Sequence, residues 1–142
     1  MTKQDKLGIL ITGGGRRIGV AIAKALAADG WFVYIHCHKS SDEAALVLND
    51  IRKNYGDGMV IVEDLSLVGA AEKVIKQAVQ GPVPLVAMVN NASLFEYDSI
   101  KTGSEESRDE DCQNNVKSPS PRVQAFSWAL NYHRGGCSIK IL

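Results

Sequence analysis

The sequence has only three cysteines and no net charge, and each of these features excludes a class of protein. The cysteines are far apart and form no Cys-x-x-Cys pair, so we expect reduced thiols, no disulfide framework and no metal site. Sixteen basic residues balance sixteen acidic ones, which argues against nucleic-acid binding or membrane-surface binding. No apolar run approaches the roughly 20 residues that span a bilayer, and the start lacks the apolar region of a signal peptide. These absences predict a cytoplasmic globular protein.

The chain has 142 residues, enough for one domain with a hydrophobic core. Four short runs rich in valine and isoleucine, at residues 7–11, 31–35, 59–62 and 85–89, are separated by helical patterns. This alternation is typical of β-α-β units and a parallel sheet. Residues 137–142 look like a fifth strand. The pattern therefore predicts an α/β fold.

Apolar residues recur at helical spacing between these strands. The first expected helix covers residues 18–26 and stops at Gly30. The second starts at Ser40 or Ser41, where Ser-Ser-Asp-Glu makes a capping box. The third runs from about residue 66 to 79. A fourth is expected over residues 114–130, although Pro119 and Pro121 fall inside it and interior prolines disfavour a helix.

A glycine-rich turn follows the first strand, from Thr12 to Gly19. Its spacing does not fit Gly-x-Gly-x-x-Gly, and it lacks the lysine and hydroxyl residue of a P-loop. Glycines still let the backbone turn tightly beside a ligand, and the first N–H groups of the next helix favour an anion. The turn predicts a phosphate site for a nucleotide cofactor, with a plain strand-to-helix turn as the alternative.

Cations and a hydroxyl follow the second strand, at His38, Lys39 and Ser40. A dinucleotide-binding fold that prefers NAD usually carries an acidic residue here for the ribose 2′-hydroxyl. Lysine and serine would instead hold a 2′-phosphate, which favours NADP. The other interpretation is a solvated helix cap.

Polar and small residues also follow the third and fourth strands. Asp64 could place a carboxylate near an adenine amino group, or could cap a helix. The segment Asn90-Asn91-Ala92-Ser93 lets the backbone approach a ligand closely. In an open parallel sheet, this is the edge where ligands bind.

Four segments occur in order along the chain: Thr12-Gly13-Gly14-Gly15-Arg16-Arg17-Ile18-Gly19, Asp64-Leu65-Ser66, Asn90-Asn91-Ala92-Ser93 and Asn115-Val116-Lys117-Ser118-Pro119. Together they resemble the short-chain dehydrogenase/reductase superfamily. Arg17 replaces the usual middle glycine, and with His36-x-His38-Lys39-Ser40 it is similar to the pteridine reductase-like branch. The resemblance covers essentially the whole chain.

The resemblance implies a Rossmann-type doubly wound parallel sheet in three α/β/α layers, C-terminally truncated and therefore incomplete at about five strands. Residues 1–142 would form a single dinucleotide-binding domain. The implied cofactor is NADP(H), and the implied reaction is reduction of a carbonyl or a pterin-like C=N bond by hydride transfer.

The resemblance also assigns parts of the cofactor to residues. The glycine turn would contact the pyrophosphate and the nearby ribose. The segment after the second strand would contact the 2′-phosphate, and the segment after the third strand would contact the adenine. The segment after the fourth strand would lie on the ribose side of the cleft. The expected cofactor-binding residues are Gly13, Gly15, Arg16, Arg17, Ile18, Gly19, His38, Lys39, Ser40, Asp64, Leu65, Asn91, Ala92 and Ser93.

The family's chemistry uses a tyrosine that protonates the substrate, a lysine four residues later and usually a serine, on segments after the fifth strand. Tyr97 and Lys101 have this spacing, but they lie in an acidic stretch shortly after the fourth strand, so we interpret the match as coincidence. Only Asn115 matches a catalytic position, where the family uses it to hold the lysine through water.

Two hypotheses follow. The chain is a short-chain dehydrogenase/reductase-type oxidoreductase, or it is a truncated, catalytically inactive protein that binds dinucleotide or forms oligomers. Residues 138–142 would form an exposed sheet edge, so we expect them to pair with a second chain or to stay disordered.

Overall fold

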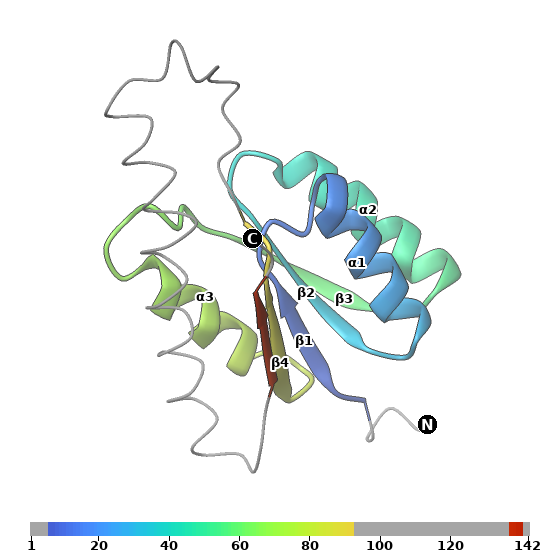
Figure 1. The fold of residues 1–142 in the computed structure, drawn as a ribbon. Coiled ribbons are helices and arrows are strands. Elements are labelled where there is room, and N and C mark those ends of the chain that lie inside the picture. The colour runs from blue at the N-terminus through green and yellow to red at the C-terminus, as the bar shows by residue number, and fades with distance from the viewer. Residues whose placement is uncertain (1–5, 93–136, 141–142) are drawn as a thin grey trace.

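The computed structural model describes residues 6–92 and 137–140 of the chain (Figure 1). In these residues, strands and helices alternate along the sequence. Their bounds are β1 Gly8–Ile11, α1 Arg17–Ala28, β2 Phe32–Cys37, α2 Ser41–Asn54, β3 Gly58–Val62, α3 Ala70–Val79, β4 Leu85–Asn90 and β5 Cys137–Lys140. Every neighbouring pair of strands is parallel, in the order β3-β2-β1-β4-β5. The predicted α/β fold and parallel sheet are confirmed.

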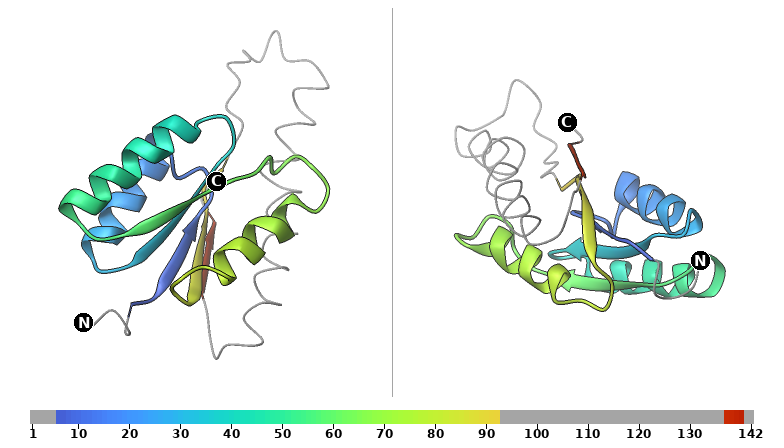
Figure 2. Two further views of the ribbon diagram at one scale, coloured as in Figure 1. Left: turned by 180° about the vertical axis from the view of Figure 1, so that it is seen from behind. Right: turned by 90° about the horizontal axis from the view of Figure 1, so that it is seen from below.

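The sheet lies between two layers of helices (Figure 2). Successive strand residues point to opposite faces, so Ile9 and Ile11 pack with α1 and α2, while Leu10 packs with α3. Because helices cover both faces of the sheet, every residue of β1 and β2 is buried, and these strands show no alternation of buried and exposed positions. This is the doubly wound three-layer arrangement that the sequence predicted.

Helix α3 begins at Ala70, so the predicted start near residue 66 is wrong. The Asp64 carboxylate accepts hydrogen bonds from both the N–H and the hydroxyl of Ser66, which bends the chain into a turn. Gly69 then has a φ of +78°, a left-handed conformation outside the right-handed region that continues a helix. Together these local features delay the helix by about one turn.

The predicted end of β2 is also wrong, and so is the capping box at the start of α2, although that helix begins at Ser41 as predicted. Strand β2 continues to Cys37, because His36 and Cys37 pair with Ile61 and Val62 of β3. His36 is therefore a buried strand residue and not part of the following loop. At the start of α2, Ser40 makes no side-chain capping bond, and its backbone carbonyl accepts the N–H of Ala44.

Cys37 is a free thiol, as predicted, and lies in the core between the sheet and α2. Its burial raises the pKa of the thiol, which keeps it protonated and unreactive. Cys112 lies outside the described residues.

Strand β5 pairs with β4 along Cys137–Lys140, so in the described residues it is the edge strand of this chain's own sheet. Pairing of the free side of β5 with a second chain stays a prediction. The expected fourth helix over residues 114–130 lies outside the described residues, and the single domain over residues 1–142 stays a prediction. Within the described ranges, no helix combines the length and apolar character needed to cross a membrane.

Tyr34 ties β2 to the loop before β4. Its buried hydroxyl donates a hydrogen bond to the Val83 carbonyl and accepts one from the Val83 N–H, at 3.1 Å. The ring fills the space beside Gly8 and Gly81, where an added Cβ would overlap it. The packing of the Tyr34 ring therefore requires glycine at both position 8 and position 81.

We expect Tyr34→Phe to lower the free energy of unfolding by about 1–3 kcal/mol, because both polar groups of Val83 lose their buried partner. Urea denaturation measures the change. Tyr55→Phe is the matched control, since Tyr55 is exposed and should change stability by less than about 0.5 kcal/mol. Equal losses in the two variants would contradict a role for the Tyr34 hydroxyl.

Candidate functional site

The carboxyl ends of the parallel strands meet at one edge of the sheet. β1 lies between β2 and β4, and the chain connects to one side through α1 and to the other through α3. In open α/β sheets this reversal of direction opens a crevice where ligands bind. The glycine turn after β1 and the segments after β2, β3 and β4 all reach this edge, as predicted.

Thr12 joins the glycine turn to the end of β4. Its buried hydroxyl accepts hydrogen bonds from the N–H groups of Asn91 and Ala92, each at 3.0 Å. The Thr12 N–H in turn donates to the Val89 carbonyl at 3.1 Å. One side chain therefore sets the path of the backbone that leaves β4.

His36 joins the same turn to the ends of β2 and β3. Its Nδ1 lies 3.2 Å from the Gly13 nitrogen, and its Nε2 lies 2.8 Å from the Glu63 carbonyl oxygen. The backbone carbonyl of His36 also accepts the Gly14 N–H at 3.0 Å. The amides of Thr12, Gly13 and Gly14 are thus all bonded within the protein, which leaves the N–H groups that follow, at the start of α1, for an anion.

The glycines of the turn lie close to neighbouring segments. Gly13 has a φ of +65°, and an added Cβ would lie 3.0 Å from the Ala92 Cα. A Cβ on Gly19 would overlap the Gly13 carbonyl oxygen and lie 2.8 Å from Asn91 Nδ2. A Cβ on Gly15 would lie 3.0 Å from the Ala44 Cβ in the first turn of α2. Glycine is therefore a steric requirement at Gly13 and Gly19.

Arg17 has a left-handed φ of +50°, although it carries a side chain. The left-handed region costs a residue with a Cβ about 1–2 kcal/mol, so the fold holds strain at the start of α1. A glycine, which the family that the sequence resembles usually has at this position, would adopt the same conformation without this strain. The Arg17 side chain and that of Ile18, which is 62% exposed, stand at the surface next to the turn.

Arg16 is held at the surface by α2. Its Nε lies 2.9 Å from a carboxylate oxygen of Glu43, and both side chains are more than half exposed. Exposed pairs of this kind contribute at most about 1 kcal/mol to stability. The pair does keep the guanidinium of Arg16 beside the turn, where the sequence predicts a binding site for the pyrophosphate.

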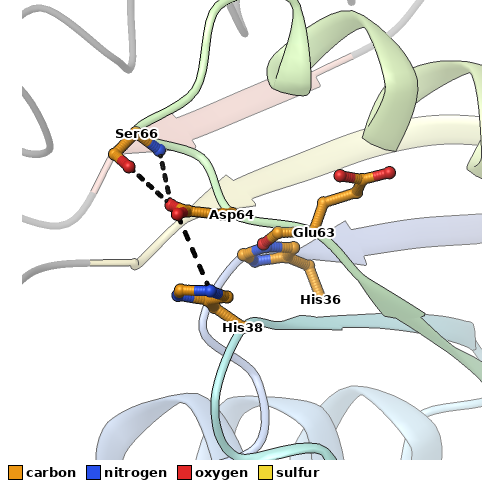
Figure 3. A network of polar contacts seen from close by, with 5 residues as sticks. All are labelled: His36, His38, Glu63, Asp64 and Ser66. Carbon is orange, nitrogen blue, oxygen red and sulfur yellow. Dashed lines mark hydrogen bonds and ion pairs between the residues drawn. The ribbon is translucent and has the colours of Figure 1, made fainter.

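The segments after β2 and β3 face each other (Figure 3). His38 Nε2 lies 3.7 Å from a carboxylate oxygen of Asp64. The hydrogen bonds from Ser66 hold the pKa of Asp64 below its usual value, and the nearby His38 and Lys39 lower that pKa further. Asp64 is therefore ionised, and the two residues assigned to different parts of the cofactor are direct neighbours.

The structure brings together most of the predicted cofactor-binding residues at this edge. His38 and Lys39 are exposed there, Ser40 is half-buried, and Leu65 is buried against α3. Ser93 and Asn115 lie outside the described residues. So do Tyr97 and Lys101.

Sequence reasoning missed the roles of Thr12, His36 and Glu43. The first two are buried polar residues at strand ends, and a threonine or histidine directly after an apolar run was the available signal. Their partners lie up to 80 residues away, so no local pattern could identify the bonds.

Known proteins are similar to this chain in sequence. A family model described as short chain dehydrogenase matches residues 8–141. Elsinochrome reductase 1 of Elsinoe fawcettii is 36% identical over 100 residues, which are 70% of this chain and 38% of that protein. Versicolorin reductase stcU of Emericella nidulans is 34% identical over 92 residues, which are 65% of this chain and 35% of that protein.

A solved structure is similar in fold and sequence. The crystal structure of FolM alternative dihydrofolate reductase 1 from Brucella suis, in complex with NADP, superimposes with a TM-score of 0.83 at 33% identity. The match covers 96% of this chain and 56% of that one. The chain thus spans about half the length of this structure, and less of the two relatives named above.

We expect Thr12→Val to lower the free energy of unfolding by about 2 kcal/mol or more, because two N–H groups after β4 lose their acceptor. Thr12→Ser is the control, since it keeps the hydroxyl and removes one methyl group, which costs about 1 kcal/mol. Urea denaturation of both variants measures the difference. If serine destabilises as much as valine does, the hydroxyl does not hold this part of the site.

Proposed function

The chain belongs to the short-chain dehydrogenase family, and on this premise we propose that it binds NADP(H) at the carboxyl edge of its sheet. The observation that carries the proposal is the glycine turn, in which the amides of Thr12, Gly13 and Gly14 are bonded internally while the following N–H groups begin α1. A helix start of this kind is suited to a pyrophosphate. The guanidinium groups of Arg16 and Arg17 stand beside it.

The choice of NADP over NAD rests on the residues after β2. A fold that prefers NAD usually has a carboxylate there to bind the ribose 2′-hydroxyl, whereas this chain has His38 and Lys39, both exposed. A 2′-phosphate would meet these cations and the Ser40 hydroxyl. The NADP bound to the Brucella suis protein supports the same choice.

Asp64 and the segment after β4 would complete the site. Asp64 is ionised and fixed by Ser66, so its carboxylate can accept a hydrogen bond from an adenine amino group. We assign Leu65 to the adenine as well, and Asn91, Ala92 and Ser93 to the ribose side of the crevice. Asn115 matches the position from which the family holds its catalytic lysine through water, and we assign it to that position although the lysine itself has no match in this chain.

The reaction that we propose for an intact member of this family is the reduction of a carbonyl or a pterin-like C=N bond. NADPH, when bound, supplies the hydride for such a reaction. The described residues of this chain would bind and orient that cofactor. The pteridine reductase-like assignment is supported by Arg17, by the His-x-His-Lys-Ser segment and by the similarity to an alternative dihydrofolate reductase. The buried free thiol of Cys37 suits a reducing compartment, which supports the cytoplasm as the location.

We expect Lys39→Glu to weaken NADPH binding by about 10- to 100-fold, because a charge-assisted contact of about 1.5–3 kcal/mol is replaced by repulsion. NADH binding should change by less than about threefold. Titration of NADPH and NADH fluorescence measures both affinities. The matched control is Lys53→Glu, the same charge change in the last turn of α2, about 20 Å away along the helix. If the two cofactors weaken equally, the 2′-phosphate assignment is wrong.

We further expect the 142-residue chain to bind NADPH without oxidising it. The family's tyrosine and lysine lie after the fifth strand, and no Tyr-x-x-x-Lys follows residue 101. Loss of NADPH absorbance with quinone, ketone and dihydropterin substrates measures turnover. Turnover would rule out the inactive alternative, and failure of NADPH to bind would contradict the proposed function itself.

A further inference from the structure

His36 is a buried histidine whose two ring nitrogens both reach the backbone of other segments. It is 3% exposed, at the end of β2. Nδ1 lies 3.2 Å from the Gly13 nitrogen in the glycine turn, and Nε2 lies 2.8 Å from the Glu63 carbonyl oxygen after β3. In Figure 3, the ring lies against the backbone at Glu63, while His38, two residues later, points toward the carboxylate of Asp64.

The two backbone partners fix the protonation of the ring. An amide N–H can only donate a hydrogen bond and a carbonyl oxygen can only accept one, so Nδ1 must be the acceptor and Nε2 must carry the proton. His36 is therefore neutral in the described arrangement. A proton on Nδ1 would point at the Gly13 N–H and break that bond.

The ring adds a contact to the turn that the sheet does not supply. β2 already pairs with β1 and β3 through the backbone, and the Glu63 N–H already donates to the Cys37 carbonyl at 3.0 Å. The Gly13 N–H lies beyond the end of β1, outside this ladder. Together with the His36 carbonyl, which accepts the Gly14 N–H, the ring fixes two successive amides of the turn from one residue.

We infer that His36 is a positioning residue for the phosphate-binding turn, which acts through the Gly13 amide and contacts no cofactor atom. This inference rests on the proposed function, because the ligand it serves is the pyrophosphate of NADP(H). By engaging Gly13 and Gly14 from the side of β2, His36 sets where the N–H groups available to an anion begin. Thr12 holds the same turn from the side of β4.

Two substitutions separate the two ring contacts. Asparagine places an oxygen near the position of Nδ1, so His36→Asn keeps the acceptor for the Gly13 N–H. Glutamine places its amide near Nε2, so His36→Gln keeps the contact with Glu63 and loses the acceptor. Both replace an aromatic ring in the core, so each serves as the control for the loss of packing in the other.

The test uses the ¹⁵N-labelled 142-residue chain. ¹⁵N NMR of the wild-type ring should show Nδ1 without a proton and Nε2 with one. In His36→Gln, hydrogen exchange at the Gly13 amide should accelerate about tenfold or more and NADPH binding should weaken about tenfold, the equivalent of one lost hydrogen bond. In His36→Asn, both should stay within about threefold of the wild type.

A ring proton on Nδ1, or equal changes in both variants, would overturn the inference and leave His36 as a core residue only. The exchange and ring measurements need no cofactor. If the wild-type chain fails to bind NADPH, the proposed function fails, while these two measurements still decide the role of His36 in the turn.

Discussion

The site depends on the close approach of three backbone segments at the carboxyl edge of the sheet. A Cβ on Gly19 would overlap the carbonyl oxygen of Gly13, and a Cβ on Gly13 would press on Ala92. Because side chains are excluded, helix α1 can start directly above the turn, with its free N–H groups at the crevice. Arg17, between these two glycines, has a left-handed conformation that a residue with a side chain rarely adopts.

Neutral buried groups set the shape of this edge, and exposed charges surround it. Thr12 and His36 are almost fully buried, and each bonds backbone groups of another segment. Burying neutral groups with satisfied hydrogen bonds costs little, whereas burying a charge is expensive. The charged groups of Arg16 and Lys39 instead stay exposed to solvent, where they can contact a phosphate. The protein without cofactor therefore does not have to bury these charges. Geometry and charge are thus supplied by different residues.

Much of the fold could be predicted from local patterns, because a parallel sheet covered on both faces needs continuous apolar strands. Strands β1, β3 and β4 fall within a residue or so of the apolar runs. The errors occur where a specific contact overrides the pattern. The Asx turn of Asp64 and the left-handed Gly69 delay α3, and pairing with β3 extends β2 through His36. Ser93 and Asn115 lie outside the described residues, and the assignment of cofactor parts to residues stays a prediction.

The sequence by itself determined the order of apolar runs, glycines and polar strand ends, and with it the α/β fold and the edge where a phosphate would bind. Those features are local, since apolar period and glycine content act over a few residues. The tertiary structure alone decided which partner each polar group has. The Gly13 amide bonds His36 across 23 residues, and the Thr12 hydroxyl bonds Ala92 across 80. Such bonds form only after the sheet has brought the strand ends together, so they depend on strand order and not on any local pattern.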